Sequence, residues 1–209
     1  LISEEVIDVF AVAGLERPDI SILSDDFLAD VRNLPYKNVA AELLRKLLEG
    51  EIKAHGRTNL VKSRAFSDML DDSLARYRNR AVTTLEVIEE LIKIAKAVRE
   101  DRERGEQLGL NPAEVAFYDA LADNRSAVEL MGEPVLTEMA QELARLIRQN
   151  ATIDWNLRET VRARMRSLVR RLLRKYKYPP DLAEKATETV LRQAEMLAGE
   201  WGEGAAVAT

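Results

Sequence analysis

The sequence contains no cysteine and a single histidine, His55. The absence of cysteine excludes disulfide bonds, thiolate metal sites and cysteine nucleophiles, and it agrees with a reducing compartment, so we expect the protein to be cytoplasmic. We expect His55 to support the end of a helix rather than to act as a base. That leaves no histidine for a catalytic triad or for a multi-histidine metal site.

Long apolar runs are also absent. None approaches the roughly 18 to 20 residues that a bilayer span requires, and the N-terminus lacks the basic start and apolar stretch of a signal peptide, so we expect no membrane association. Of the 209 residues, 46% are hydrophobic and 32% are charged, which is too apolar for disorder and sufficient for a core. Because the first residue is Leu1 rather than methionine, we expect either a piece of a longer polypeptide or a chain whose disordered ends are not included.

Glycine and proline are few, nine and six residues, and they fall almost wholly between segments whose apolar residues recur three and four positions apart. That spacing is helical, and Asn111-Pro112-Ala113-Glu114 adds a capping box of the kind that starts a helix. The pattern predicts an all-α fold, an irregular multi-helix bundle of about eight helices with no significant sheet. We expect a looser lead-in segment over 1–35, a helical domain over 36–200 and a frayed tail over 201–209.

Five apolar stripes define the core that this pattern predicts, each on one face of a helix. Their residues are Val39, Leu43, Leu44, Leu47 and Leu48; Phe66, Met69, Leu70 and Leu74; Val82, Leu85, Ile88, Leu91, Ile92, Ala95 and Val98; Val135, Met139, Leu143, Leu146 and Ile147; and Ala183, Ala186, Val190, Leu191 and Met196. We expect these side chains to be buried.

One segment is strongly basic, although the whole chain carries a formal net charge of −5. Between Arg158 and Lys177 there are nine lysines or arginines and one glutamate, a local charge of +8, so the other residues together carry −13. A helix through 157–177 would gather apolar residues on one side and arginines around the other. Glu159 suits its first turn, and Tyr178-Pro179-Pro180 would end it.

Two interpretations of this basic helix stay open. In the first, its arginines bridge to acidic helices of the same domain while their stems cover apolar surface. In the second, they contact an external polyanion, either the phosphates of duplex DNA or an acidic partner protein. No aromatic residues interleave with the arginines, which argues against a surface that stacks single-stranded bases. The candidate partner- or DNA-contacting residues are Arg162, Arg166, Arg170, Arg171, Arg174 and Lys177.

Pro18-Asp19, followed by Glu51-Ile52-Lys53, is similar to the PD…ExK nuclease motif, whose acidic residues and lysine meet at a Mg²⁺ ion. Here the second part lies in a helical pattern, where positions i and i+2 do not share a face, so we expect no nuclease site. The sequence also lacks a phosphate-binding Walker A motif and a dinucleotide fingerprint. We expect no catalytic, cofactor or metal site in these residues, and no enzymatic activity of their own.

Four stretches together resemble a known family. They are NRAVTTLEVIEELIKIAKAVRED, LGLNPAEVAFYDALADN, LARLIRQNATIDWNLRETVRARMRSLVRRLLRKYKYPPD and ATETVLRQAEMLA. Over about residues 19–198, and in this order, they are similar to the C-terminal helical region of the R (restriction) subunit of type I restriction-modification enzymes. The T-I-D-W segment, the basic helix and the Y-P-P-D stop make the resemblance specific.

The resemblance implies a parent subunit that is an ATP-dependent type I site-specific deoxyribonuclease, with a nuclease domain, two helicase-like motor domains, and ATP and Mg²⁺ as cofactors. It implies that the helical region docks this DNA-translocating subunit onto the modification (methyltransferase) subunit of the assembled complex. DNA-site recognition would then belong to another subunit. In the alternative, the basic helix 157–177 makes the region a non-specific module that contacts the backbone of duplex DNA.

Overall fold

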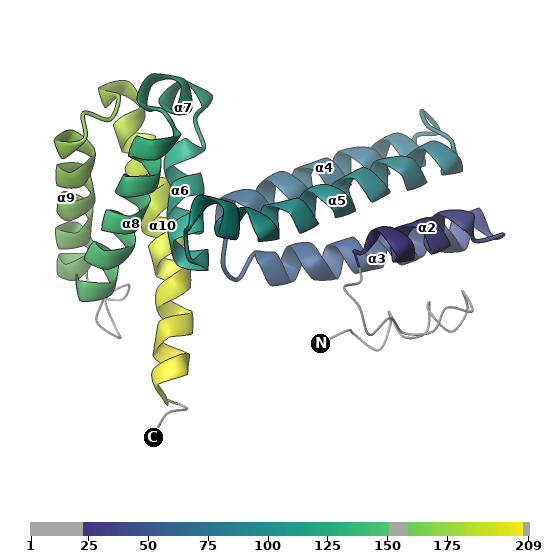
Figure 1. Cartoon of the computed structure of the whole chain (residues 1–209), viewed down its shortest axis with the longest axis horizontal. Coiled ribbons are helices and arrows are strands. Elements are labelled where there is room, and N and C mark those ends of the chain that lie inside the picture. Colours follow the sequence, from purple (N-terminus) through teal and green to yellow (C-terminus); the bar gives the residue numbers. More distant parts are fainter. Residues whose placement is uncertain (1–22, 151–158, 207–209) are drawn as a thin grey trace. The chain divides into compact units, whose positions relative to one another are not determined.

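The structure, a computed structural model, describes residues 23–150 and 159–206, and every regular element in those ranges is an α-helix (Figure 1). The helices are α2 (Asp25–Asn33), α3 (Lys37–His55), α4 (Leu60–Arg78), α5 (Thr84–Leu108), α6 (Pro112–Ala122), α7 (Arg125–Met131), α8 (Glu133–Asn150), α9 (Glu159–Lys175) and α10 (Pro180–Ala206). The predicted all-α fold without a sheet is confirmed, with nine helices in the described ranges where about eight were predicted.

The described residues divide into two compact units. Unit 1 comprises residues 23–56 and 63–104, and unit 2 comprises residues 57–62 and 105–206. The predicted boundaries at residues 35 and 200 stay predictions. Residues 1–22 of the lead-in segment lie outside the described residues. At the other end, α10 is helical through Ala206, and the fraying predicted for 201–209 stays a prediction.

Unit 1 is built from α3, α4 and α5, which share one apolar core, and from α2, which packs on α3. Five stripe residues of unit 1 are not fully buried: Val39, Leu74 and Val82 are half-buried, Met69 is 44% exposed and Leu85 is 59% exposed. The buried face of α4 contains Phe66 and Leu70, and Met69 is turned about 100° away from Leu70 around the helix. Leu85 is the second residue of α5, ahead of the helix's first buried residues.

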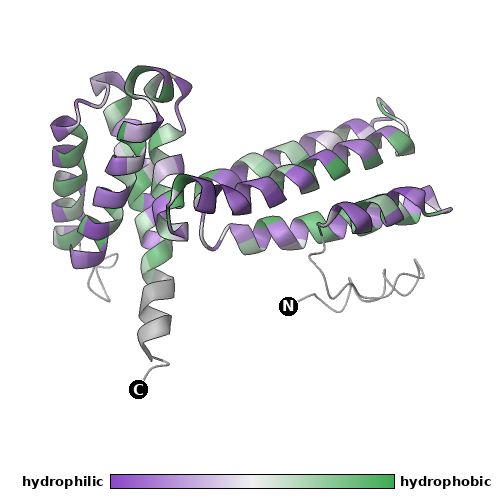
Figure 2. Cartoon of the chain, in the orientation of Figure 1, coloured by the Kyte–Doolittle hydropathy of each residue, from purple (hydrophilic) through white to green (hydrophobic). Residues whose placement is uncertain are grey.

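In unit 2, α6 and α9 each pack against both α8 and α10, and the short α7 packs against α6 and α8. The inner face of α8 consists of Leu136, Met139, Leu143 and Ile147, all with no exposed surface. Hydrophobic residues therefore follow one side of α8 and α9 while hydrophilic residues follow the other, a separation visible along both ribbons (Figure 2). The amphipathic period of the sequence thus decides which face of each helix enters the core.

The capping box predicted at the start of α6 is present. The Asn111 side chain accepts a hydrogen bond from the Glu114 amide at 3.1 Å, and the Glu114 carboxylate accepts one from the Asn111 amide at 2.9 Å. These bonds satisfy two of the backbone N–H groups that a helix start leaves without intrahelical partners. From Val115 to Leu121 every residue of α6 is buried, as expected for a helix that is apolar on nearly all sides.

A buried polar cluster fixes the segment 57–62 within unit 2. Asn59 donates to the Asp119 carboxylate at 2.6 Å. Gln193, on α10 and with no exposed surface, accepts from the Leu60 amide at 2.9 Å and donates to the Thr58 carbonyl at 2.8 Å. Because buried polar groups are costly unless they are hydrogen-bonded, these bonds hold the start of α4 in one position against α6 and α10.

His55 is the last residue of α3, as the sequence predicted for a histidine that supports a helix end. Its Nε2 lies 3.1 Å from the carboxylate of Asp101, which is also 3.4 Å from Arg104. Its ring meets Phe66 edge-on, with centroids 5.9 Å apart.

No helix in the described part of the chain combines the length and the apolar character needed to cross a membrane.

Candidate interaction surface

The basic helix predicted over 157–177 is α9, which runs from Glu159 to Lys175. Glu159 lies in its first turn and Arg174 and Lys175 lie in its last turn, where anions and cations respectively are favoured by the helix dipole. The helix packs into unit 2 through a stripe at helical spacing. The buried residues of that stripe are Met165, Val169, Leu172 and Leu173.

Helix α9 ends in a Schellman motif, whose left-handed residue lies two positions beyond the last helical residue. The Tyr178 amide donates to the Leu173 carbonyl at 2.9 Å, and the Lys177 amide donates to the Arg174 carbonyl at 3.1 Å. Lys177 adopts φ of 55°, the left-handed conformation that glycine usually supplies at this position. The sequence predicted that Tyr178-Pro179-Pro180 would end this helix. The helix ends slightly earlier, at Lys175, and Pro180 begins α10.

One flank of α9 is joined to α10 by ion pairs. They are Arg162–Glu195 at 3.0 Å, Arg166–Glu188 at 2.7 Å and Arg170–Glu184 at 2.6 Å. The arginines are four residues apart, so they lie along one side of the helix. As the residue number of the arginine increases along α9, that of its glutamate partner decreases along α10, so the two helices are antiparallel. For these three arginines, the interpretation as internal bridges agrees with the geometry.

The other flank is joined to α8. Lys175 contacts the Glu142 carboxylate at 2.7 Å, and the Tyr176 hydroxyl donates to Glu142 at 2.7 Å and to Glu138 at 3.0 Å. The hydrogen bonds from Lys175 and Tyr176 lower the pKa of Glu142 below its usual value, against a smaller opposing effect of burial. Glu142 therefore stays ionised, and α9 is held on both flanks.

The remaining candidates are Arg171 and Arg174, on the outward side of α9, and Lys177, two residues beyond its end. Arg171, Arg174 and Lys177 are exposed, and none makes an ion pair with an acidic side chain among residues 23–150 and 159–206. Among the described residues, Arg174 donates only to the Arg170 carbonyl, at 3.4 Å. The six predicted residues are thus divided into three that are paired within unit 2 and three that are open. We call Arg171, Arg174 and Lys177 the open cations.

Of the nuclease-like motif, the second part alone lies among the described residues. Glu51 and Lys53 lie on α3, as the helical pattern predicted, and Glu51 forms an ion pair with Arg102. Pro18 and Asp19 lie outside the described residues. In the part of the chain that the structure describes, no group of three or more histidine or acidic residues is placed to hold a metal ion.

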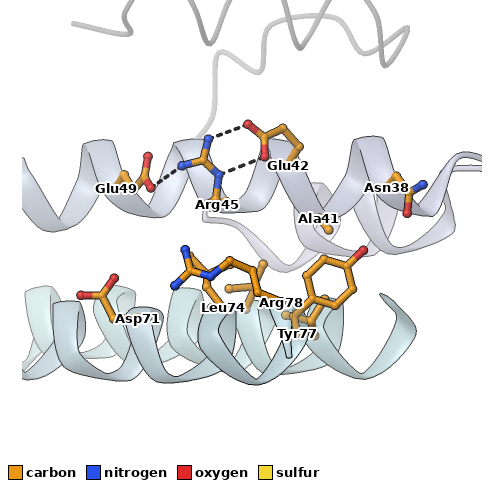
Figure 3. A pocket seen from close by; sticks show the side chains of 11 residues that line it. Asn38, Ala41, Glu42, Arg45, Glu49, Asp71, Leu74, Tyr77 and Arg78 are labelled. Atoms are coloured by element: carbon orange, nitrogen blue, oxygen red, sulfur yellow. Dashed lines mark hydrogen bonds and ion pairs between the residues drawn. The ribbon is translucent and has the colours of Figure 1, made fainter. Parts of the chain in front are cut away.

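Sequence reasoning missed a cavity of about 410 Å³ in unit 1. Its lining comes from three helices: Asn38, Ala41, Glu42, Arg45 and Glu49 of α3, Asp71, Leu74, Tyr77 and Arg78 of α4, and Val87 and Leu91 of α5. The close-up shows α3 and α4 side by side with the labelled side chains between and beside them (Figure 3). The available sequence signal was the spacing of Glu42, Arg45 and Glu49, which places an arginine between two acids on one helix face.

Arg45 is fixed on the α3 side of this cavity. Its guanidinium donates to Glu42 at 2.6 and 2.9 Å and to Glu49 at 2.5 Å (Figure 3). The hydrogen bonds from Arg45 hold the pKa of Glu42 below its usual value, although burial opposes the effect. The three side chains together therefore carry one net negative charge.

Comparison with known proteins identifies related sequences. A sequence model of the family described as type I restriction enzyme HindI endonuclease subunit-like, C-terminal, matches residues 1–200. The type I restriction enzyme HindI endonuclease subunit of Haemophilus influenzae is 44% identical over 196 residues, which are 94% of this chain and 19% of that protein. A Methanocaldococcus jannaschii protein assigned as the type I restriction enzyme MjaIXP endonuclease subunit is 32% identical over 174 residues, 83% of this chain and 17% of that protein.

The chain therefore spans less than a fifth of the length of either relative. No solved structure matches it significantly.

Proposed function

Because the chain belongs to the family of HindI-like type I restriction enzyme endonuclease subunits, as their C-terminal region, we propose that it docks the endonuclease subunit onto the modification (methyltransferase) core of the complex. Nuclease and ATP-driven motor activity, with Mg²⁺ and ATP, are expected from other parts of the whole subunit, in the cytoplasm. The role of these residues is to couple that subunit to its partners.

The observation that carries the proposal is how α9 is held. Ion pairs join one flank to α10 and the other to α8, so the helix is anchored on both sides. The open cations Arg171, Arg174 and Lys177 therefore project from a backbone that is already ordered. When a partner binds, the entropy cost on this side is mainly that of fixing these three side chains. A fixed cationic face of this kind suits an acidic patch on another protein, where charge complementarity aids encounter and register.

The open cations also favour a second candidate function, contact with the backbone of duplex DNA. Three unpaired cations at the end of one helix could neutralise phosphates without reading sequence. This alternative predicts an affinity that is the same for duplexes of any sequence and that decreases steeply as the salt concentration rises. The two functions make different demands on the same three residues, so one set of variants can separate them.

The experiment uses the full-length endonuclease subunit with Arg171→Ala, Arg174→Ala and Lys177→Gly combined. Glycine suits position 177 because its φ is positive. If each exposed contact contributes about 0.5 kcal/mol, docking predicts an affinity for the purified modification complex that is about tenfold lower at low salt. The DNA alternative predicts instead that the slope of log affinity against log salt, measured on a non-specific duplex, decreases by about 2 to 3.

The matched control changes the same net charge elsewhere. Lys53, Arg64 and Lys93 are exposed and make no ion pair with a described acidic side chain, so their triple alanine variant should alter either affinity less than about twofold, since isolated surface charges contribute little. Equal losses in the two triple variants would mean that only net charge matters, and would refute a docking role for the end of α9.

A further inference from the structure

We propose that the groove between α3 and α4 in unit 1 is a second docking surface, and that it receives a basic amphipathic helix of the modification subunit. This inference rests on the proposed docking function, which it deepens by naming another surface and the chemistry of its occupant. The groove is the 410 Å³ cavity lined by α3, α4 and α5.

The shape of the groove suits a helix. Its lining residues on α3 run from Asn38 to Glu49 and recur every three or four positions, so they follow one face of the helix for about three turns, roughly 16 Å. On α4 the lining runs from Asp71 to Arg78. A groove of that length, open along its side, accommodates a few turns of helix that inserts side chains at i, i+3 and i+4 spacing.

The floor of the groove is apolar. Val87 and Leu91 of α5 have no exposed surface and Ala41 is 8% exposed, so these three side chains close the bottom. Leu74 and the ring of Tyr77 are half-buried and form the α4 wall (Figure 3). An apolar side chain of the occupant would cover Leu74 and remove the remaining apolar surface from water, which is the main favourable contribution to such contacts.

The rim of the groove is acidic. Glu42, Arg45 and Glu49 together carry one negative charge, because Arg45 is already bonded to both acids. Asp71 faces the Glu49 end from α4 (Figure 3) and makes no ion pair with the described residues. Arg78 is the one lining cation without an acidic partner among them, so the lining as a whole carries one net negative charge.

The surroundings strengthen this sign. Asp68 lies about one turn before Asp71 on α4 and is exposed without an ion-pair partner in the described ranges. The end of the groove at Glu49 and Asp71 is therefore where lysines or arginines of the occupant would bind. Arg78 is exposed, and it can donate to the carbonyls that the C-terminal end of an occupying helix leaves without intrahelical partners. A basic helix fits this arrangement better than an acidic one.

The first test compares two neighbouring aspartates in the full-length endonuclease subunit. Asp71→Lys reverses a charge in the lining of the groove, whereas Asp72→Lys makes the same change on the same helix outside that lining. We expect Asp71→Lys to weaken binding to the purified modification complex about tenfold at low salt, and Asp72→Lys to weaken it less than about twofold. Circular dichroism of both variants should match the wild type, since both positions are exposed.

The second test identifies the occupant. A photo-crosslinking amino acid replaces Asn38, which lines the groove, or Met69, which is 44% exposed on α4 but does not line it. In the complex assembled from purified subunits, the probe at 38 should crosslink to a lysine- or arginine-rich helical segment of the modification subunit, and the probe at 69 should not.

The outcomes separate this inference from the function on which it rests. Equal effects of the two aspartate variants, or crosslinking to an acidic segment, would overturn the groove proposal while docking through α9 stands. A wild-type subunit that does not bind the modification complex at all would overturn both. Crosslinking at 38 to a second endonuclease subunit would also contradict the proposal, because it would show that the groove joins two copies.

Discussion

Replacing Gln193 by methionine tests whether the buried polar cluster holds segment 57–62, with the first residues of α4, within unit 2. The side chain has no exposed surface, accepts from the Leu60 amide at 2.9 Å and donates to the Thr58 carbonyl at 2.8 Å. Leu60 is the first residue of α4, so its amide has no intrahelical acceptor. Methionine has a similar size but restores neither bond.

The expected cost follows from those two backbone groups. A buried donor or acceptor that loses its partner costs about 1 to 3 kcal/mol, and both groups are only half-buried, so the sum should be about 2 to 4 kcal/mol. This is a large share of the 5 to 15 kcal/mol typical of a whole domain. Gln141→Met on α8 is the matched control, because that glutamine is exposed and its replacement should change stability by less than about 0.5 kcal/mol.

Two measurements check the prediction. Urea unfolding of the chain gives the change in free energy, and hydrogen exchange gives the protection of the Leu60 amide, which should decrease in the Gln193→Met variant. If Gln193→Met unfolds like Gln141→Met and the exchange of the Leu60 amide is unchanged, the hydrogen bonds of Gln193 do not hold the start of α4, and the reasoning is refuted.

Three further predictions concern unit 2. A double-mutant cycle on Arg166 and Glu188, which are 34% and 36% exposed, should give a coupling of about 0.5 to 1 kcal/mol that decreases with salt; a larger coupling that is independent of salt would contradict partial screening. Burial raises the pKa of Tyr178 from 10.0 to about 12, so its contribution to stability is complete below pH 10 and is lost as pH rises through 12. Between pH 10 and 12 the free energy of unfolding of Tyr178→Phe should therefore decrease less with pH than that of the wild type. Parallel pH profiles of the two proteins would contradict the shift. Leu143→Ala, in the core with no exposed surface, should cost about 2 to 5 kcal/mol in urea unfolding, against less than about 0.5 kcal/mol for Leu130→Ala, which is 72% exposed.

The helical period predicted the buried side of α9 well but could not assign its arginines. Met165, Val169 and Leu172 are buried where the pattern required. Which arginines are paired depends on how α9 lies along α10, and that register is set by tertiary packing. Glu188 illustrates the limit. It lies four residues before Arg192, a spacing that favours an ion pair within α10, yet it accepts a hydrogen bond from Arg166 of α9 at 2.7 Å.

The period also gives the direction of a helix face but not its width or its extent. Met69 and Leu85 follow the same spacing as their buried neighbours, yet both are exposed. One lies beside the packed face of α4 and the other lies in the first turn of α5. The groove and the polar cluster were beyond prediction for a related reason. The Gln193 side chain bonds to residues 133 and 135 positions away, and no local pattern encodes contacts at that separation.

The central claim, that the open end of α9 is a docking surface for the modification core, is tested most directly by hydrogen–deuterium exchange of the full-length endonuclease subunit. Adding the purified modification complex should slow exchange over residues 171–178, and adding a non-specific duplex alone should leave that segment unchanged. Slowing by the duplex alone, or no slowing there when the modification complex is bound, would contradict the account.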